Sequence, residues 1–208
     1  MRKLVLATTN KGKVAELRSL LAELPVEIVG LDHFTNVPEV AETGTTFLEN
    51  AALKAKAIGE FTGALALADD SGLEVDALGG EPGVYSARYG EPGWNDRQRF
   101  EHLLEKIKGF PATERAARFQ AAVAFYDPAG QVLETATGAV EGQIIDEPRG
   151  SNGFGYDPIF FLPEYGQTMA EIGSQHKNEL SHRARAVKAL LPLLRNYLEK
   201  NLNRCPST

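Results

Sequence analysis

Residues 46–72 read TFLENAALKAKAIGEFTGALALADDSG, and this stretch predicts a helix followed directly by a buried strand. Thr46 and Glu49 have the spacing of a capping box, in which each side chain satisfies a backbone N–H at the start of a helix. We expect the helix to run to about Thr62, with Gly63 as its stop. A helix that alternates with buried strands is typical of α/β proteins.

The apolar run Ala64 to Ala68 predicts a core strand that ends in Asp69-Asp70-Ser71-Gly72. Open α/β sheets place their ligands beyond the carboxyl ends of strands. Adjacent side chains of an extended chain point to opposite faces, so one carboxylate would face a site and the other would support it. The facing carboxylate could hold Mg²⁺ or deprotonate an attacking water. The alternative is an Asx-type turn that caps the strand.

Further elements flank this unit on both sides. Strand patterns occupy residues 3–7, 26–29, 119–126, 131–140 and 159–162, and helical patterns follow residue 10, Asn95 and Ser181. The segments 119–126 and 131–140 are joined by a turn sequence, which predicts an antiparallel hairpin. The pattern therefore predicts an α/β protein with a mixed sheet flanked by helices.

The composition is that of an ordinary globular protein of 208 residues, with a formal net charge of −6 and a pI of about 5.3. This charge disfavours non-specific binding to nucleic acid. The single cysteine, Cys205, allows no internal disulfide, and no apolar stretch is long enough to span a membrane. We expect one domain over residues 1–202, a flexible tail over residues 203–208, and a cytoplasmic location.

Thr8-Thr9-Asn10-Lys11-Gly12-Lys13 lies between a predicted strand and a predicted helix. Unpaired backbone N–H groups and the helix dipole favour an anion at such a place. The hydroxyls, the amide and the lysines add the donors that a triphosphate needs. The spacing differs from that of a P-loop. The alternative is a capped helix with a solvated pair of lysines.

A third group of residues could recognise a purine base. It combines the loop Gly153-Phe154-Gly155-Tyr156-Asp157 with Lys177 and with Ser181-His182-Arg183. An aromatic ring between glycines can approach a flat base, Asp accepts from ring N–H groups, and Lys and Arg donate to carbonyl oxygens. Each piece also has a structural alternative: Phe154 could be a core residue, Asp157 could open a turn, and His182 could lie on the surface.

These segments together resemble the inosine triphosphate pyrophosphatase family, which hydrolyses deaminated purine nucleotides. The resemblance spans the chain to about Asn201, in the family's order and spacing. It rests on LATTNKGK (6–13), TFLENA (46–51), ADDSGL (68–73), LGG (78–80), PGVYSARY (82–89), GFGYDP (153–158) and SHR (181–183). The resemblance implies an elongated α/β fold of two lobes around a central substrate cleft, and a homodimer.

The resemblance also implies a role for each candidate residue. Asp70 would be the general base and a Mg²⁺ ligand, Glu42 the second metal-site carboxylate, and Asp69 a supporting acid. Lys54 would help to neutralise the triphosphate. The remaining substrate contacts would be Thr8, Thr9, Asn10, Lys11, Gly12 and Lys13 at the phosphates, then Ser71, and Phe154, Gly155, Tyr156, Asp157, Lys177, His182 and Arg183 around the base.

The implied reaction is hydrolysis of ITP, dITP or XTP to the monophosphate and pyrophosphate, which removes deaminated purines from the nucleotide pool. Donors at the C6 carbonyl would disfavour adenine, whose amino group would leave them unpaired. Two alternatives are a related pyrophosphatase with another base preference and a non-catalytic purine-nucleotide sensor. The sensor would leave Glu42, Asp69 and Asp70 unexplained. A nucleic-acid-binding module fits least, because the sequence has no basic stripe.

Overall fold

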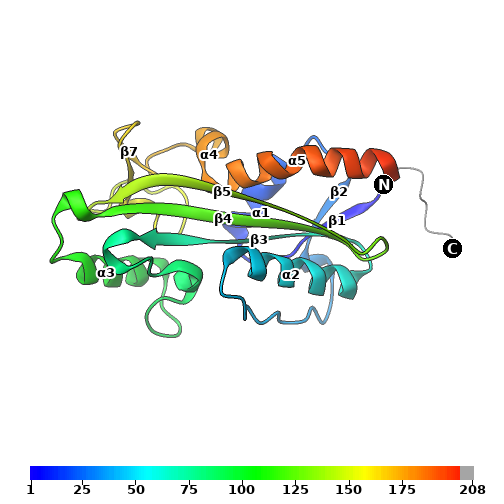
Figure 1. Ribbon diagram of the computed structural model, residues 1–208, viewed down its shortest axis with the longest axis horizontal. Coiled ribbons are helices and arrows are strands. Elements are labelled where there is room, and N and C mark those ends of the chain that lie inside the picture. Colours follow the sequence, from blue (N-terminus) through cyan, green and yellow to red (C-terminus); the bar gives the residue numbers. More distant parts are fainter. Residues whose placement is uncertain (202–208) are drawn as a thin grey trace.

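The computed structural model describes residues 1–201 and has an elongated α/β architecture (Figure 1). One seven-stranded sheet runs through it in the order β2-β1-β3-β4-β5-β6-β7. β1 is parallel to β2 and β3, whereas every neighbouring pair from β3 to β7 is antiparallel. The strands are β1 (Lys3–Leu6), β2 (Glu27–Gly30), β3 (Leu65–Val75), β4 (Ala116–Asp127), β5 (Val132–Ile144), β6 (Phe160–Leu162) and β7 (Gln167–Thr168). The predicted mixed sheet is confirmed, and the predicted tail, residues 203–208, lies outside the described residues.

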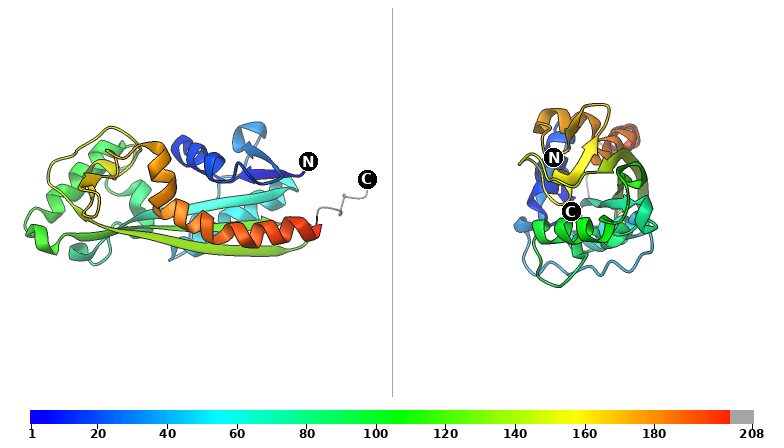
Figure 2. Two further views of the ribbon diagram at one scale, coloured as in Figure 1. Left: turned by 90° about the horizontal axis from the view of Figure 1, so that it is seen from above. Right: turned by 90° about the vertical axis from the view of Figure 1, so that its left-hand side faces the viewer.

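Helices cover both faces of this sheet (Figure 2). α5 packs on β4, β5 and α1, whereas α2 packs on β3 and β4 from the opposite face. The helices are α1 (Lys11–Leu20), α2 (Phe47–Thr62), α3 (Asp96–Ile107), α4 (Ser174–Leu180) and α5 (His182–Asn201). None of the helices within residues 1–201 has the length and apolar content that a membrane crossing requires.

The capping-box prediction for α2 is confirmed in both of its bonds. The Thr46 side chain accepts from the Glu49 backbone N–H at 3.1 Å, and the Glu49 carboxylate accepts from the Thr46 N–H at 3.2 Å. The helix ends at Thr62, and Gly63 has the left-handed conformation, with φ of 63°. Local side-chain chemistry thus sets the start and the end of this helix.

The predicted end of the following strand is wrong, because β3 continues to Val75 and contains Asp69, Asp70, Ser71 and Gly72. The antiparallel partner β4 pairs with β3 from Ala66↔Tyr126 to Val75↔Ala117, so the backbone beyond Ala68 keeps its hydrogen bonds. No turn caps the strand at the acidic pair. The parallel neighbour β1 stops at Leu6, opposite Leu67, and the two carboxylates therefore lie just past its end.

The apolar core divides into three clusters, which define two lobes. Two clusters lie on opposite faces of the sheet under α1 and α5 and under α2. The third is built around α3, β6 and the distal part of β3, with Leu73, Phe100 and Phe160. Asp69 to Gly72 lie between these cores, at the boundary of the lobes. The expected two-lobed α/β fold is confirmed.

Candidate active site

The segment after β1 begins α1 and lines a large hollow. Asn10 caps the helix by accepting from the Lys13 N–H at 3.1 Å, and Thr8 Oγ1 accepts from the Asn10 N–H at 3.2 Å. The large hollow has a cavity volume of about 1010 Å³. Thr8, Thr9, Asn10, Lys11, Lys13, Glu42 and Lys54 are among its lining residues. Five of the six residues predicted to contact the phosphates thus share one space with Glu42 and Lys54, and of the two predicted metal ligands only Glu42 lines it.

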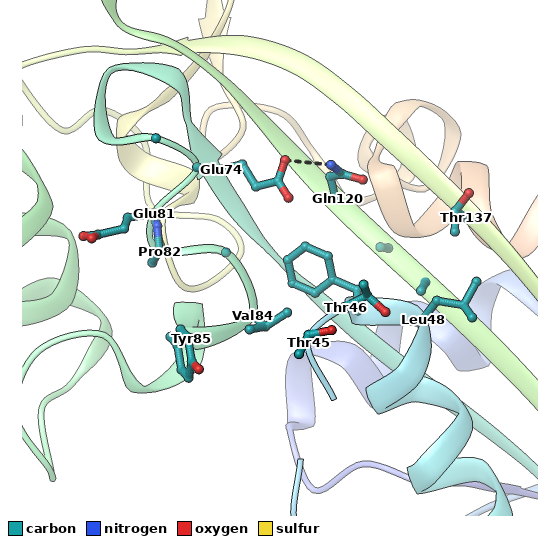
Figure 3. A pocket seen from close by; sticks show the side chains of 16 residues that line it. Thr45, Thr46, Leu48, Glu74, Glu81, Pro82, Val84, Tyr85, Gln120 and Thr137 are labelled. Atoms are coloured by element: carbon teal, nitrogen blue, oxygen red, sulfur yellow. Dashed lines mark hydrogen bonds between the residues drawn. The ribbon is translucent and has the colours of Figure 1, made fainter. Parts of the chain in front are cut away.

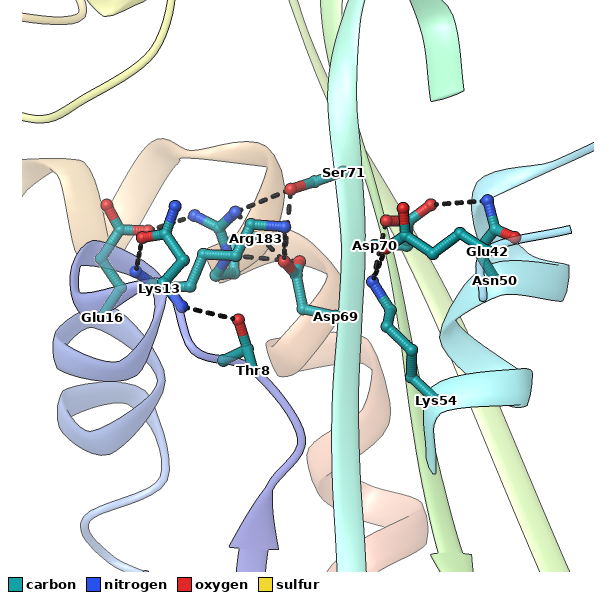
Figure 4. Close-up of polar contacts among 11 residues, drawn as sticks. Thr8, Lys13, Glu16, Glu42, Asn50, Lys54, Asp69, Asp70, Ser71 and Arg183 are labelled. Atoms are coloured by element: carbon teal, nitrogen blue, oxygen red, sulfur yellow. Dashed lines mark hydrogen bonds and ion pairs between the residues drawn. The ribbon is translucent and has the colours of Figure 1, made fainter. Parts of the chain in front are cut away.

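Asp70 does not line this hollow itself, but it contacts Lys54, which does. Lys54 Nζ is 2.9 Å from Asp70 Oδ1 and 2.8 Å from Glu42 Oε1, so one ammonium group holds two carboxylates (Figure 4). Asn50 donates to Asp70 Oδ2 at 3.2 Å. Burial raises the pKa of Asp70 above its ordinary value, although Lys54 opposes the rise. Asp70 is therefore a carboxylate with an enhanced affinity for a proton.

Glu42 has a second cation beside it. Arg88 Nη1 is 2.7 Å from Glu42 Oε2, and Arg88 is the last residue of the 3₁₀ helix η3 (Gly83–Arg88). Burial acts to raise the pKa of Glu42, but the bonds from Lys54 and Arg88 outweigh it and lower the pKa. Glu42 and Asp70 are thus neutralised by two cations from different elements.

The carboxylates of Glu42 and Asp70 fit a Mg²⁺ site that the substrate completes. Both contact the same Lys54 ammonium group, so both can reach one small cation. Mg²⁺ is usually held by one or two carboxylates together with waters and substrate phosphates. Within residues 1–201, no group of three or more His, Cys, Asp or Glu residues could cage a metal by itself. The donor set suits a metal that arrives with phosphates.

Asp69 points to the other face of β3, as the alternation of side chains predicts (Figure 4). Its fully buried carboxylate is 2.6 Å from Lys13 Nζ and 3.2 Å from Arg183 Nε, and it accepts from the Ser71 hydroxyl at 3.2 Å. Burial acts to raise the pKa of Asp69, but Arg183 and Lys13 outweigh it and hold the pKa far below its ordinary value. Asp69 is therefore ionised at neutral pH.

The Asp69 cluster extends to the predicted base loop. Arg183 also contacts Glu16, which is 3.0 Å from Lys177 Nζ. Lys177 is in turn 2.6 Å from Asp157 Oδ2, which accepts from the Phe154 N–H at 2.9 Å. A continuous chain of charges therefore joins β3 to the loop that carries Phe154.

A small hollow, with a cavity volume of about 100 Å³, lies next to this chain. Phe154, Gly155, Tyr156, Asp157, Lys177 and His182 line it, together with Asn10, Lys13 and Ser71. The imidazole of His182 stacks on Phe119, with ring centroids 4.8 Å apart. Burial, followed by the charge of Arg183, lowers the pKa of His182 well below 6.5, so the ring is neutral. Its Nδ1 is buried without a hydrogen-bond partner among the described residues.

Four predicted site residues line neither hollow: Gly12, Asp69, Asp70 and Arg183. A Cβ on Gly12 would fall 2.5 Å from the Phe154 ring, so glycine allows the phosphate segment and the base loop to touch. The guanidinium of Arg183 is fully buried among Asp69, Glu16 and Ser71. The structural alternatives for Lys13 and His182 are wrong, because Lys13 is mostly buried and His182 is not on the surface.

A third hollow, of about 500 Å³, lies between the N-terminus of α2 and the loop before Tyr85 (Figure 3). Glu74 and Gln120 are hydrogen-bonded to each other at 2.7 Å on its wall. None of the predicted site residues lines this hollow. Every predicted site residue that lines a hollow therefore lines the large or the small one.

Sequence reasoning missed several residues of the site. Glu16 lies one helical turn after Lys13 on α1, and this spacing was the available signal that the two share a face. Asn50 and Arg88 lie within segments that carry the family resemblance, but nothing local indicated their partners. Asp96 accepts from the Gly155 N–H at 2.8 Å. It is the first residue of α3, in the lobe built around α3 and β6.

Comparison with known proteins identifies close relatives of the whole chain. The model of the Ham1 family matches residues 4–193. The dITP/XTP pyrophosphatase of Bacillus licheniformis is 48% identical over 194 residues, which are 93% of this chain and 98% of the relative. That of Desulforamulus reducens is 51% identical, with 92% and 95% covered.

Solved structures support the same relationship. A HAM1 protein from Coxiella burnetii has a TM-score of 0.85 and 41% identity, over 94% of this chain and all (100%) of the other. A nucleoside-triphosphatase / dITP/XTP pyrophosphatase from Mycobacterium abscessus has a TM-score of 0.74 and 41% identity, with 91% and 99% covered. The likeness therefore includes both lobes and the site between them.

Proposed function

The chain belongs to the Ham1 family, and from this premise we propose that it hydrolyses ITP, dITP and XTP to the monophosphate and pyrophosphate. It is an enzyme of the nucleoside triphosphate pyrophosphatase type, and it covers nearly the full length of relatives that bear the name dITP/XTP pyrophosphatase. The observation that carries the proposal is the position of Asp70. This carboxylate has a raised pKa and is paired with Lys54, which also holds Glu42 and lines the large hollow.

Asp70 is the general base of the proposed reaction. It accepts a proton from a water molecule, whose oxygen attacks the α-phosphorus of the nucleotide. The bond between the α-phosphorus and the oxygen that bridges to the β-phosphorus breaks, and pyrophosphate leaves with that oxygen. General base catalysis of this kind typically contributes about 10²- to 10⁴-fold.

The start of α1 and the nearby lysines bind the triphosphate in this proposal. Backbone N–H groups at a helix N-terminus favour anions, and the ammonium groups of Lys13 and Lys54 add positive charge. Mg²⁺ would be held by Glu42 and Asp70, and when bound it offsets negative charge on the phosphate oxygens. Substrate and metal enter the large hollow, where the phosphate segment, Glu42 and Lys54 meet.

The small hollow takes the base. Phe154, Tyr156, Asp157, Lys177 and His182 line it, and the Arg183 guanidinium lies 5.7 Å from the centroid of the Phe154 ring. Donors directed at the C6 carbonyl accept hypoxanthine or xanthine. Adenine presents an amino group there, which would leave the donors unpaired and cost binding energy. This is the basis of the proposed discrimination against adenine, whereas discrimination against guanine, which has the same C6 carbonyl, must come from contacts at C2.

We also propose a homodimer and a cytoplasmic location, both from the family resemblance. Sedimentation at micromolar protein concentration tests the first, and a monomeric mass would contradict it. The location does not affect the chemistry that we assign to the site.

The direct test is pyrophosphate release from ITP, XTP, GTP and ATP, with and without Mg²⁺. We expect metal-dependent release from ITP and XTP and little from the other two. Equal cleavage of all four would retain the hydrolytic site but refute the base-reading assignment. Tight binding without release would instead favour a purine-nucleotide sensor.

A further inference from the structure

Arg88, the last residue of η3, brings a positive charge to Glu42, the carboxylate proposed to hold the metal. Its Nη1 is 2.7 Å from Glu42 Oε2, and these residues are 46 positions apart in the sequence. The Arg88 side chain is 46% exposed, whereas that of Lys54, the other partner of Glu42, is 14% exposed. Arg88 is therefore the accessible cation of this cluster.

The backbone that carries Arg88 is well anchored. The Ser86 hydroxyl accepts from the Leu73 N–H at 2.9 Å and donates to the Gly83 carbonyl at 2.6 Å. The Tyr156 hydroxyl donates to the Ser86 carbonyl at 2.9 Å, which ties η3 to the base loop. Ala87 lines both the large and the small hollow. Arg88 thus directly follows a residue that lines both proposed sites.

The charges around Glu42 change when a metal and a nucleotide arrive. In the free protein, Glu42 and Asp70 are matched by Lys54 and Arg88. A divalent cation brings two positive charges to the same carboxylates and repels both side-chain cations. A triphosphate places several negative charges beside them. The exposed guanidinium then has a better partner in the phosphates than in Glu42.

We propose that Arg88 is a further phosphate-binding residue, which neutralises Glu42 in the free protein and moves to the triphosphate when Mg²⁺ takes Glu42. The proposal rests on the proposed function. Guanidinium groups suit this role, because their planar set of N–H donors matches two phosphate oxygens at once. The anchored backbone of η3 requires only the side chain to move.

The test compares Arg88→Ala and Arg88→Lys with the wild-type protein. Calorimetry measures the affinity for a non-hydrolysable α,β-methylene analogue of ITP with Mg²⁺, and steady-state kinetics follows ITP. We expect Arg88→Ala to weaken analogue binding and to lower kcat/KM by about 10- to 100-fold, as loss of a charge-assisted hydrogen bond implies. Arg88→Lys should retain part of both. Arg97→Ala is the matched control, since Arg97 is an exposed arginine of α3 that pairs with Glu101.

Arg88 could instead serve only to neutralise Glu42. In that case Arg88→Ala would bind the analogue as tightly as the wild type, and its half-saturating Mg²⁺ concentration would fall because Glu42 is released. That result would overturn the proposal. Wild-type protein that neither binds the analogue nor releases pyrophosphate would refute the proposed function, and this inference with it. If the wild type hydrolysed ITP and Arg88→Ala had the same analogue affinity and the same kcat/KM, only this inference would be refuted.

Discussion

Asp69 and Asp70 are neighbours in sequence, but the two faces of β3 give them opposite environments. Asp69 has no exposed surface, and Lys13 and Arg183 hold its pKa far below the ordinary value against the effect of burial. Asp70 is also largely buried, but burial there outweighs Lys54 and raises the pKa. One carboxylate is thus a fixed anion and the other a proton acceptor.

The difference teaches that the number and burial of the paired cations, rather than burial alone, decide what an acid in this site can do. Asp69 has two cationic partners, Lys13 and Arg183, and Arg183 is itself held by Glu16. Asp70 has one, Lys54, which it shares with Glu42. The Asp69 face therefore holds the phosphate segment and the base loop in place, and the Asp70 face is free to exchange its partners for metal and substrate.

Asp70→Asn should give the largest effect on activity. The amide cannot accept a proton from water, so we expect kcat for ITP to fall by about 10²- to 10⁴-fold. Because the ionised form of Asp70 is disfavoured in the folded protein, the free energy of unfolding at neutral pH should not decrease by more than about 1 kcal/mol. Pyrophosphate release and urea unfolding measure the two quantities. Near-normal turnover would refute the role of Asp70.

Asp69→Asn should instead act first on stability. The substitution leaves Lys13 without its anion and Arg183 with Glu16 alone, and breaking such a buried pair costs about 3–5 kcal/mol. Urea unfolding of this variant beside Asp70→Asn provides the comparison, since the two substitutions are chemically identical and one residue apart. If both variants unfolded at the same urea concentration, the distinction between the two faces of β3 would be lost.

The sequence was sufficient to predict those features of the fold that depend on neighbouring residues in the chain. The Thr46 capping box and the Gly63 stop set the bounds of α2, and alternation along β3 placed Asp69 and Asp70 on opposite faces. The extent of β3 was not predictable in this way. Asp69 to Gly72 resemble a strand end locally, but pairing with β4, some 50 residues later, keeps them in the sheet.

The missed part of the site has a similar cause. The candidate residues were chosen from motifs, which are short, continuous stretches of the sequence. Glu16 acts through Arg183, from which it is separated by 167 positions, and Arg88 acts on Glu42 across 46 positions. No local pattern encodes such contacts, because tertiary packing of different elements creates them. The family resemblance identifies the segments that carry the motifs, but the ion pairs between those segments form only in the folded chain.

A carboxyl titration would sharpen the comparison of the two faces directly. In the metal-free protein, ¹³C NMR should find that the pKa of Asp70 is above, and that of Asp69 below, the ordinary value for Asp of about 3.9. The signals are assigned from the Asp69→Asn and Asp70→Asn variants.

The sign of the stability effect follows from these shifts. The stabilisation from Asp69 is present above its unfolded pKa and is lost as the pH falls through its lower folded pKa. Ionisation of Asp70 destabilises the folded protein as the pH rises through its unfolded and then its folded pKa. The reverse order of the two carboxyl titrations would contradict the assignment of fixed anion and base.

The smallest expected effect concerns His182, which lies on the Asp69 side of the site. Burial, followed by Arg183, lowers its pKa well below 6.5, so the ring should stay neutral between about pH 6 and pH 8, where an ordinary histidine titrates. The ratio of kcat/KM for ITP to that for ATP should therefore be constant over this range, while kcat itself can vary. ¹⁵N NMR of the ring gives an independent measure. A ratio that changed with the titration of one group near pH 6.5, with both ring nitrogens protonated at the acid end, would mean that the Asp69 face also exchanges protons during substrate selection.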